Sequence, residues 1–247
     1  MRMRSIAGIL AVALVATVFT LRAEEEKKDP AKALPKTITP VIKNEGFKKR
    51  HDGFVEIAKK GDADLLFMGD SITDGWRGGG KKVWDATFAP LKAINFGIGG
   101  DQTQHVLWRI ENGELEVIKP KLMVLMIGTN NGGDSKEDVA LGITTIVKET
   151  QKRLPDTKIL LLAIFPRGEK AENNKGRAKN MEVNQIIQKQ YEGDKMVKYM
   201  DIGDKFLDEK KDLPKDIMPD FLHPNAKGYQ IWADAILPTV KDMMGAK

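Results

Sequence analysis

Five short apolar runs with little polar alternation recur along the chain, and amphipathic stretches lie between them. The runs are Leu65 to Met68, Ala93 to Phe96, Leu122 to Ile127, Ile159 to Ile164 and Val197 to Met200. Continuous apolar runs of this length are typical of strands that are buried on both faces. Parallel neighbours need long crossover connections, which helices in the amphipathic stretches would supply. The pattern therefore predicts an α/β fold with a doubly wound, five-stranded parallel sheet.

Apolar residues at helical spacing assign the amphipathic stretches to helices. The stripe of a first helix, which ends before Gly61, consists of Phe47, Phe54, Ile57 and Ala58. Later helices are expected over residues 103–112, 138–153 and 173–191. A last helix begins near Asn225, and Pro238 is expected to kink its late part. About 200 residues suit one such sheet, so a single domain is predicted.

The composition excludes several classes of protein. Of the 247 residues, 41% are hydrophobic and 30% are charged, which supplies the core of an ordinary domain and excludes disordered and collagen-like chains. The chain contains no cysteine. Disulfide bonds, CxxC redox chemistry, thiolate zinc sites and a cysteine nucleophile are therefore excluded.

Residues 1–23 have the layout of a secretory signal peptide. Arg2 and Arg4 precede an uncharged apolar stretch from Ile6 to Leu21, and Ala23 offers a small residue for cleavage. The stretch is shorter than the roughly 20 residues that span a bilayer comfortably. We expect a cleaved leader, no stable membrane insertion afterwards, and a periplasmic or secreted domain. A retained leader would also place the domain outside the cytoplasm.

Residues 24–43 combine a charged run with three prolines, a composition that predicts an extended linker, so the folded domain is expected to cover residues 44–247. The net charge of +5 falls by three to +2 when the arginines of the leader are removed. The remaining charges are of mixed sign and form no basic stripe. No nucleic-acid partner is therefore expected.

Glycine-rich segments follow the first three predicted strands. They read GDSITDGW at residues 69–76, GIGGD at 97–101 and GTNN at 128–131. In an open parallel sheet, ligands bind beyond the carboxyl ends of the strands, so these junctions are the expected place of the site. Spacing argues against a phosphate-binding loop, because Gln102 stands where G-x-G-x-x-G requires its last glycine.

Ser71, after the first strand, is the candidate nucleophile, although a serine there also suits a helix N-cap. Near the other end of the chain, Asp220 precedes His223 by three residues; a surface turn is the alternative for this pair. A serine hydroxyl needs a base that takes its proton, and the imidazole needs a partner on Nδ1. His223 and Asp220 can supply these two roles.

Attack by a serine also requires donors for the oxyanion of the tetrahedral intermediate. The candidates are the backbone N–H groups of Ser71 and Gly99 and the side-chain amide of Asn130, each at the end of a neighbouring strand. Asn130 would also suit a turn without any catalytic role. His51 and His105 are expected to be structural or surface residues.

Four segments in the right order, GDSITDGW, GIGGD, GTNN and DFLHP at residues 220–224, resemble the sequence blocks of the SGNH (GDSL-type) hydrolases. Residues 97–121 and the Pro166-Arg167-Gly168 sequence look like the catalytic subunits of platelet-activating-factor acetylhydrolases. The resemblance implies a flavodoxin-like three-layer α/β/α sandwich with five parallel strands. It also implies a catalytic triad and an oxyanion hole formed by the residues named above, with no metal and no cofactor.

The implied activity is that of a serine esterase with an acyl-serine intermediate, active at neutral or mildly alkaline pH because His223 must start unprotonated. Short connections and the lack of an apolar lid favour short acyl groups. We therefore expect removal of acetyl groups from O-esters of an extracellular carbohydrate, the partner being a small-molecule or polysaccharide ester. A platelet-activating-factor-like phospholipid acetylhydrolase is one alternative, and a non-catalytic binding module is another. The resemblance also implies a homodimer.

Overall fold

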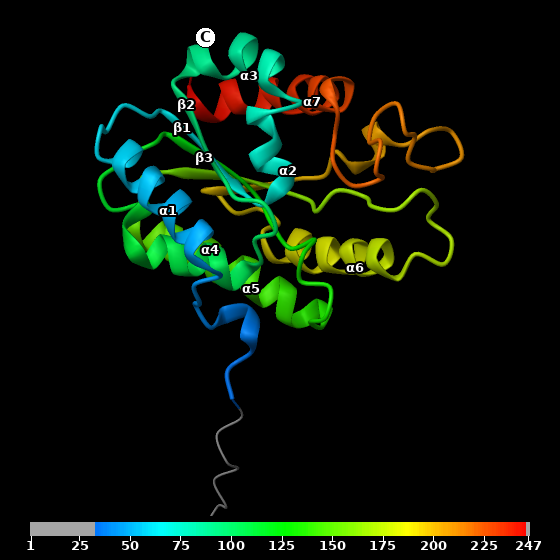
Figure 1. The fold of residues 1–247 in the computed structure, drawn as a ribbon, viewed down its shortest axis with the longest axis horizontal. Coiled ribbons are helices and arrows are strands. Elements are labelled where there is room, and N and C mark those ends of the chain that lie inside the picture. Colours follow the sequence, from blue (N-terminus) through cyan, green and yellow to red (C-terminus); the bar gives the residue numbers. More distant parts are fainter. Residues whose placement is uncertain (1–32, 246–247) are drawn as a thin grey trace, which may run out of the picture. The chain divides into compact units, whose positions relative to one another are not determined.

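The computed structural model describes residues 33–245, and those from Leu34 onward belong to one compact unit. Its centre is a parallel sheet with the strand order β2-β1-β3-β4-β5 (Figure 1). The strands are β1 Leu65–Gly69, β2 Ala93–Gly97, β3 Leu122–Met126, β4 Lys158–Leu162 and β5 Val197–Met200. All five predicted strands are therefore confirmed, with ends that differ by two residues at most.

Helices cover both faces of this sheet, because successive side chains of a strand point to opposite faces. The helices are α1 Glu45–Ala58, α2 Ser71–Asp74, α3 Lys81–Thr87, α4 Thr103–Arg109, α5 Lys136–Arg153, α6 Lys175–Gln190 and α7 Ala226–Met244. Leu66 and Met68 of β1 pack with α1, α4, α5 and α6, whereas Leu65 and Phe67 pack with α3 and α7 (Figure 1). The three-layer sandwich is thus confirmed.

The carboxyl ends of the three strands β2, β1 and β3 lie level with one another. Gly69, the last residue of β1, is in register with Gly97 of β2 and Met126 of β3. The chain leaves β1 toward β2 on one side and later returns to form β3 on the other. This is the kind of topological switch point at which ligands bind in open sheets.

One helix differs from its predicted form, and the kink expected at Pro238 of the last helix stays a prediction. The helix expected over residues 103–112 ends at Arg109 and is followed by a wider turn over Ile110–Glu114, because Gly113 has a φ of +110° that no α-helix permits. The last helix begins after the cap Asn225, as predicted, and continues through Pro238 to Met244.

Residues 34–43 differ from the predicted linker because they pack against the domain. A 3-10 turn, η1 (Lys36–Ile38), buries Thr37, and the Thr37 carbonyl oxygen accepts a hydrogen bond from Thr103 Oγ1 at 2.9 Å. The backbone N–H of Val41 donates to the carbonyl of Gln104 at 3.4 Å. The proline-rich composition that indicated a tether instead supports an extended strap whose backbone groups bond to α4.

The predicted leader, residues 1–23, and the first part of the predicted linker lie outside the described residues. Between residues 33 and 245, none of the helices has the length and apolar character needed to cross a membrane.

Candidate active site

Ser71 is the first residue of α2, which follows β1 after a single residue. The cap of this helix is Asp70, whose Oδ1 accepts a hydrogen bond from the backbone N–H of Ile72 at 3.0 Å. The N-cap role that the sequence left open for Ser71 therefore belongs to Asp70. The first N–H groups of a helix have no partner inside it, which suits the Ser71 N–H as an oxyanion donor.

Two glycines allow α2 to approach the sheet so closely. A Cβ on Gly69 would lie 2.3 Å from Thr73 Oγ1 of α2, and a Cβ on Gly97 would lie 2.3 Å from the backbone nitrogen of Asp74. Real Cβ atoms do not approach other atoms so closely, so any larger residue would push α2 away. The position of Ser71 thus depends on glycine at the ends of β1 and β2.

The loop before α7 places an imidazole against the Ser71 hydroxyl. His223 Nε2 lies 2.9 Å from Ser71 Oγ, and His223 Nδ1 lies 2.6 Å from Asp220 Oδ2. The three side chains that the sequence selected from opposite ends of the chain are therefore in direct hydrogen-bond contact. Both His223 and Asp220 are partly exposed, which leaves the site open to substrate and water.

Asp220 is fixed by more than its bond to the imidazole. Its Oδ1 accepts hydrogen bonds from the backbone N–H groups of Leu222 at 3.1 Å and His223 at 2.8 Å. Partial burial pushes the pKa of Asp220 upward, but the hydrogen bonds from the His223 ring and from these two backbone groups outweigh it and hold the pKa below its usual value. Asp220 is therefore a carboxylate at neutral pH.

The two other candidate oxyanion donors lie on loops beside Ser71. A Cβ on Gly99 would lie 3.9 Å from Ser71 Cβ, so the backbone of Gly99 passes directly beside the serine. Asn130 Nδ2 donates to the carbonyl oxygen of Asp101 at 2.9 Å, while Gln102 Nε2 donates to the Asn130 carbonyl at 2.6 Å. A side-chain amide has two N–H groups, and one of those of Asn130 donates to the Asp101 carbonyl. The other N–H is the candidate oxyanion donor.

The chain matches the model of the GDSL-like lipase/acylhydrolase family over residues 67–231, a stretch that includes every candidate residue described above. It belongs to this family. The protein is therefore an acylhydrolase, that is, an enzyme that hydrolyses carboxylic esters.

Curated relatives and solved structures agree with this assignment. The acylhydrolase is 40% identical over 197 residues to the human platelet-activating factor acetylhydrolase IB subunit alpha2, an alignment that covers 80% of this chain and 84% of the relative. It is 38% identical to the human alpha1 subunit over 179 residues, or 72% of this chain and 76% of that protein.

Among solved structures, a GDSL-like lipase from Bacteroides thetaiotaomicron superimposes with a TM-score of 0.65 at 21% identity, covering 79% of this chain and 97% of that one. Axe2, an acetylxylan esterase from Geobacillus stearothermophilus, superimposes with a TM-score of 0.55 at 22% identity, covering 76% and 97% of the two chains. At this level of identity the similarity establishes the shared fold alone.

Asp70, the cap of the acylhydrolase's short helix, carries an unusual carboxyl group. Its side chain is buried, and burial raises its pKa to about 6, although the hydrogen bond from the Ile72 N–H and the nearby His223 favour the charged form. Asp70 was not predicted as a functional residue, because the motif places it directly before the candidate nucleophile Ser71.

We expect the Asp70→Asn variant to be more stable than the parent at pH 7. The pKa of this carboxyl is about 6 in the folded state and about 3.8 in the unfolded state. The parent protein therefore loses stability as pH rises from about 4 to about 6, because ionisation of Asp70 is disfavoured only in the folded state. Asparagine keeps the cap acceptor and cannot ionise. Urea unfolding between pH 4 and 7 should show a gain of about 1–3 kcal/mol at pH 7 that disappears near pH 4. A variant less stable than the parent at pH 7 would contradict this account.

A buried group of charges lies beneath the Gly99 loop. The fully buried Arg109 places Nε 3.1 Å from Asp101 Oδ2 and Nη1 3.0 Å from Glu114 Oε2, and its Nη1 also donates to the carbonyl of Phe96 at 2.7 Å. Burial raises the pKa of Asp101 to about 7, opposed by the charges of Arg109 and Lys43. These contacts were not predicted from the sequence, in which the position of Arg109 directly after the apolar residues Val106, Leu107 and Trp108 was the one signal of them.

The two other histidines have structural roles, as predicted. His51 is buried with Nδ1 3.0 Å from Glu114 Oε1, and His105 Nδ1 accepts the backbone N–H of Gln102 at 3.0 Å. No group of three or more potential metal ligands occurs in the part of the chain that the structure describes.

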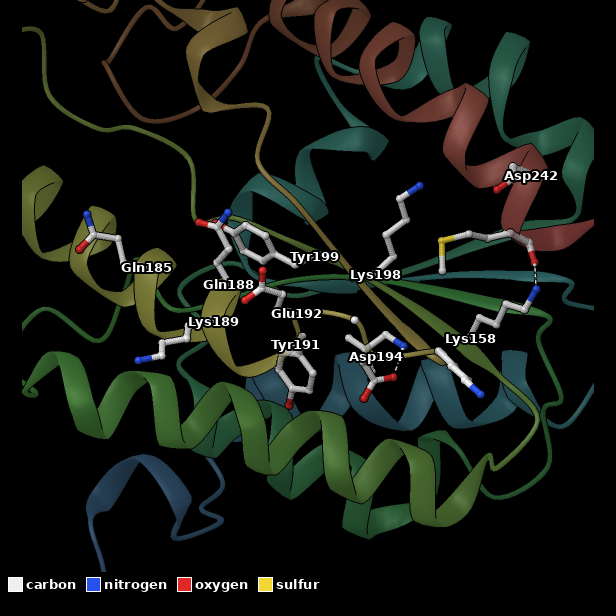
Figure 2. A pocket seen from close by; sticks show the side chains of 14 residues that line it. Lys158, Gln185, Gln188, Lys189, Tyr191, Glu192, Asp194, Lys198, Tyr199 and Asp242 are labelled. Atoms are coloured by element: carbon white, nitrogen blue, oxygen red, sulfur yellow. Dashed lines mark hydrogen bonds between the residues drawn. The ribbon is translucent and has the colours of Figure 1, made fainter.

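A hollow of 710 Å³ lies away from the candidate active site, at the free edge of β5 (Figure 2). Its walls come from the end of α6, the turn after it, β5 and the end of α7, with Tyr199 and Lys198 on the strand itself. None of the candidate catalytic residues lines it. The size of this cavity therefore does not point to the candidate residues, because Ser71 and His223 meet elsewhere on the protein.

Proposed function

We propose that this acylhydrolase is a serine esterase that removes short acyl groups, in particular acetyl, from the O-esters of an extracellular carbohydrate. The observation that carries the proposal is the position of His223, whose two ring nitrogens contact Ser71 Oγ and Asp220 Oδ2 at hydrogen-bond distance. This is the geometry in which an imidazole accepts a proton from a serine while a carboxylate fixes its tautomer.

In the first half of the reaction, Ser71 Oγ attacks the acyl carbon and its proton passes to His223 Nε2. The carbonyl oxygen becomes an oxyanion. When the bond to the alcohol breaks, His223 gives the same proton to the leaving oxygen, and the acyl group stays on Ser71. The imidazolium that exists between these two transfers is stabilised by Asp220.

In the second half, water attacks the acyl-serine. His223 takes a proton from the water, a second oxyanion forms, and its collapse releases the carboxylic acid and returns the proton to Ser71. Both oxyanions would be bound by the N–H groups of Ser71 and Gly99 and by the Asn130 amide. Donors held in advance stabilise this charge without reorganisation, which is why one such donor is worth about 10²–10³ in rate.

Two comparisons support acetyl as the acyl group. The relatives at 40% and 38% identity are named acetylhydrolases, and the Geobacillus structure with the same fold is named an acetylxylan esterase. The carbohydrate part of the proposal depends on export, which rests on the layout of residues 1–23. A leader that delivers the enzyme to the periplasm or the medium would bring it to acetylated polysaccharides. Homodimerisation stays a prediction.

The names of the two curated relatives favour a second candidate substrate, a phospholipid with a short acyl chain of the platelet-activating-factor kind. The two substrates share the acetyl ester and differ in the alcohol. The alcohol side of the site, not the catalytic residues, would therefore decide between them.

We expect the enzyme to prefer acetate over longer acyl chains and acetylated carbohydrate over lipid. Along a series of p-nitrophenyl esters from acetate to laurate, kcat/KM should fall by about tenfold or more, since a shallow site gains nothing from a long chain. Acetate release should then be measured from acetylated xylan and from platelet-activating factor, with Ser71→Ala as the blank. Preference for laurate would refute the short-chain proposal, and release from the phospholipid alone would replace the carbohydrate by the second candidate.

A further inference from the structure

Lys43, from the strap ahead of α1, reaches the loop that carries a candidate oxyanion donor. Its Nζ donates a hydrogen bond to the carbonyl oxygen of Gly99 at 2.6 Å, and the two residues are 56 positions apart in the chain. A hydrogen bond from a charged donor is about twice as strong as one between neutral groups. The inference drawn from this contact rests on the proposed function, in which the Gly99 N–H binds the oxyanion.

The loop has little stiffness of its own at this point. Gly99 and Gly100 are consecutive glycines, which lose more conformational freedom on ordering than other residues. Gly100 has a φ of +72°, and a Cβ there would lie 2.7 Å from Lys43 Nζ. The ammonium group therefore occupies space beside Gly100 that the side chain of any other residue would fill. Its hydrogen bond to the Gly99 carbonyl fixes the plane of the peptide between the two glycines.

The same loop holds the second donor, the Asn130 amide, through the carbonyl oxygen of Asp101. The carboxylate of Asp101 is completely buried and lies between two cations, with Arg109 Nε at 3.1 Å and Lys43 Nζ at 3.9 Å. Arg109 fixes the loop from inside the protein and Lys43 fixes it from outside. Residues 99–101 thus link both candidate donors that are not part of α2.

We propose that Lys43 is a positioning residue of the oxyanion hole, which makes the strap over residues 34–43 part of the catalytic machinery. By holding the Gly99 carbonyl, the ammonium limits rotation about Gly99 and so keeps the adjoining Ile98-Gly99 peptide, which carries the Gly99 N–H, turned toward the developing oxyanion. Its charge also lies 3.9 Å from the carboxylate of Asp101, the residue whose backbone carbonyl accepts the Asn130 amide. An enzyme without this ammonium would bind substrate normally and stabilise the transition state less well.

The surroundings of Lys43 allow the role to be separated from a structural one. The Lys43 side chain is 27% exposed, so its replacement leaves no buried cavity. A hollow of 290 Å³ beside it is lined by Phe47, Arg50, Asp74 and Gly99 among others, enough space for a small amine to enter. Lys48 offers a matched control, because it lies on the surface of α1 and, among residues 33–245, pairs with Asp52 alone, at 2.7 Å.

The test compares Lys43→Met, Lys43→Arg and Lys48→Met in hydrolysis of p-nitrophenyl acetate. For Lys43→Met we expect kcat to fall by about 10- to 100-fold, less than the 10²–10³ typical of losing a donor outright, with KM within about twofold. Lys43→Arg should recover most of the loss, and Lys48→Met should match the parent. For Lys43→Ala, added propylammonium should restore part of kcat, and thermal unfolding should stay close to that of the parent.

Three results would overturn the inference. The first is a Lys43→Met enzyme with the parent's kcat, the second is a loss that appears in KM alone, and the third is a loss that follows a lower unfolding temperature and is not relieved by propylammonium. Failure of the proposed function looks different, because Ser71→Ala would then stay active whatever happens at Lys43. An enzyme that needs Ser71 and tolerates Lys43→Met would contradict this inference alone.

Discussion

The Ser71→Ala enzyme is expected to hydrolyse p-nitrophenyl acetate about 10⁶-fold more slowly than the parent, as judged by kcat. Without Oγ there is no nucleophile, no acyl-enzyme and no group for His223 Nε2 to deprotonate at 2.9 Å. KM should change little, since Ser71 contributes to chemistry more than to binding. Labelling with a fluorophosphonate probe should disappear in the same variant.

Ser135→Ala is the matched control for the loss of a hydroxyl. Ser135 caps α5, where its side chain accepts the backbone N–H of Asp138 at 3.0 Å, far along the chain from the site. We expect this variant to lose about 1 kcal/mol of stability and to keep the parent's kcat. A Ser71→Ala enzyme that keeps even a tenth of the parent's rate would refute the nucleophile assignment and with it the acyl-serine mechanism.

The Asp220→Asn enzyme is expected to lose about 10⁴ in kcat, the loss found for the equivalent change in a well-studied serine triad. The hydrogen bonds of Asp220 explain why the same loss is expected in this enzyme. Asp220 Oδ1 accepts the backbone N–H groups of Leu222 and His223, so the asparagine oxygen must stay at that position. The asparagine nitrogen then lies where Oδ2 was, 2.6 Å from His223 Nδ1, and donates a hydrogen bond to it. This moves the ring proton to Nε2, which can no longer accept the proton of Ser71.

Asp216→Asn is the control for the loss of a carboxylate near the same loop. Asp216 forms a surface ion pair with Lys227, and such pairs contribute little to stability or function. Its replacement should leave kcat unchanged. If Asp220→Asn and Asp216→Asn had similar rates, Asp220 would have no role in fixing the His223 tautomer.

The strands and the candidate residues could be predicted for different reasons. The strands could be predicted because a strand that is buried on both faces is a continuous apolar run, such as Leu65 to Met68. Ser71, Gly99 and Asn130 could be predicted because each follows a strand, and parallel strands end at one edge of the sheet. The residues that hold these three in place could not be predicted from the sequence. Asp70 and Lys43 act through contacts with backbone groups, which carry no sequence signal, and Arg109 acts through carboxylates that only the fold brings to it.

The strap is the clearest difference between prediction and structure. Residues 24–43 have the prolines and charges of a linker, yet Thr37 is buried and Lys43 bonds to Gly99. Composition describes how a segment behaves in isolation. It does not reveal that α4 and the Gly99 loop offer carbonyl and hydroxyl groups within hydrogen-bond distance.

By itself, the sequence determined the class of fold, the single sheet and the identity of the catalytic candidates, because periodic burial and the chemistry of each side chain are local properties of the chain. Only the tertiary structure decided that His223 meets Ser71 across 152 residues, that Asp70 and not Ser71 caps α2, and that Lys43 is bonded to the Gly99 loop. These contacts depend on how distant segments pack against one sheet edge, and a hydrogen bond is decided by tenths of an ångström that no local pattern encodes.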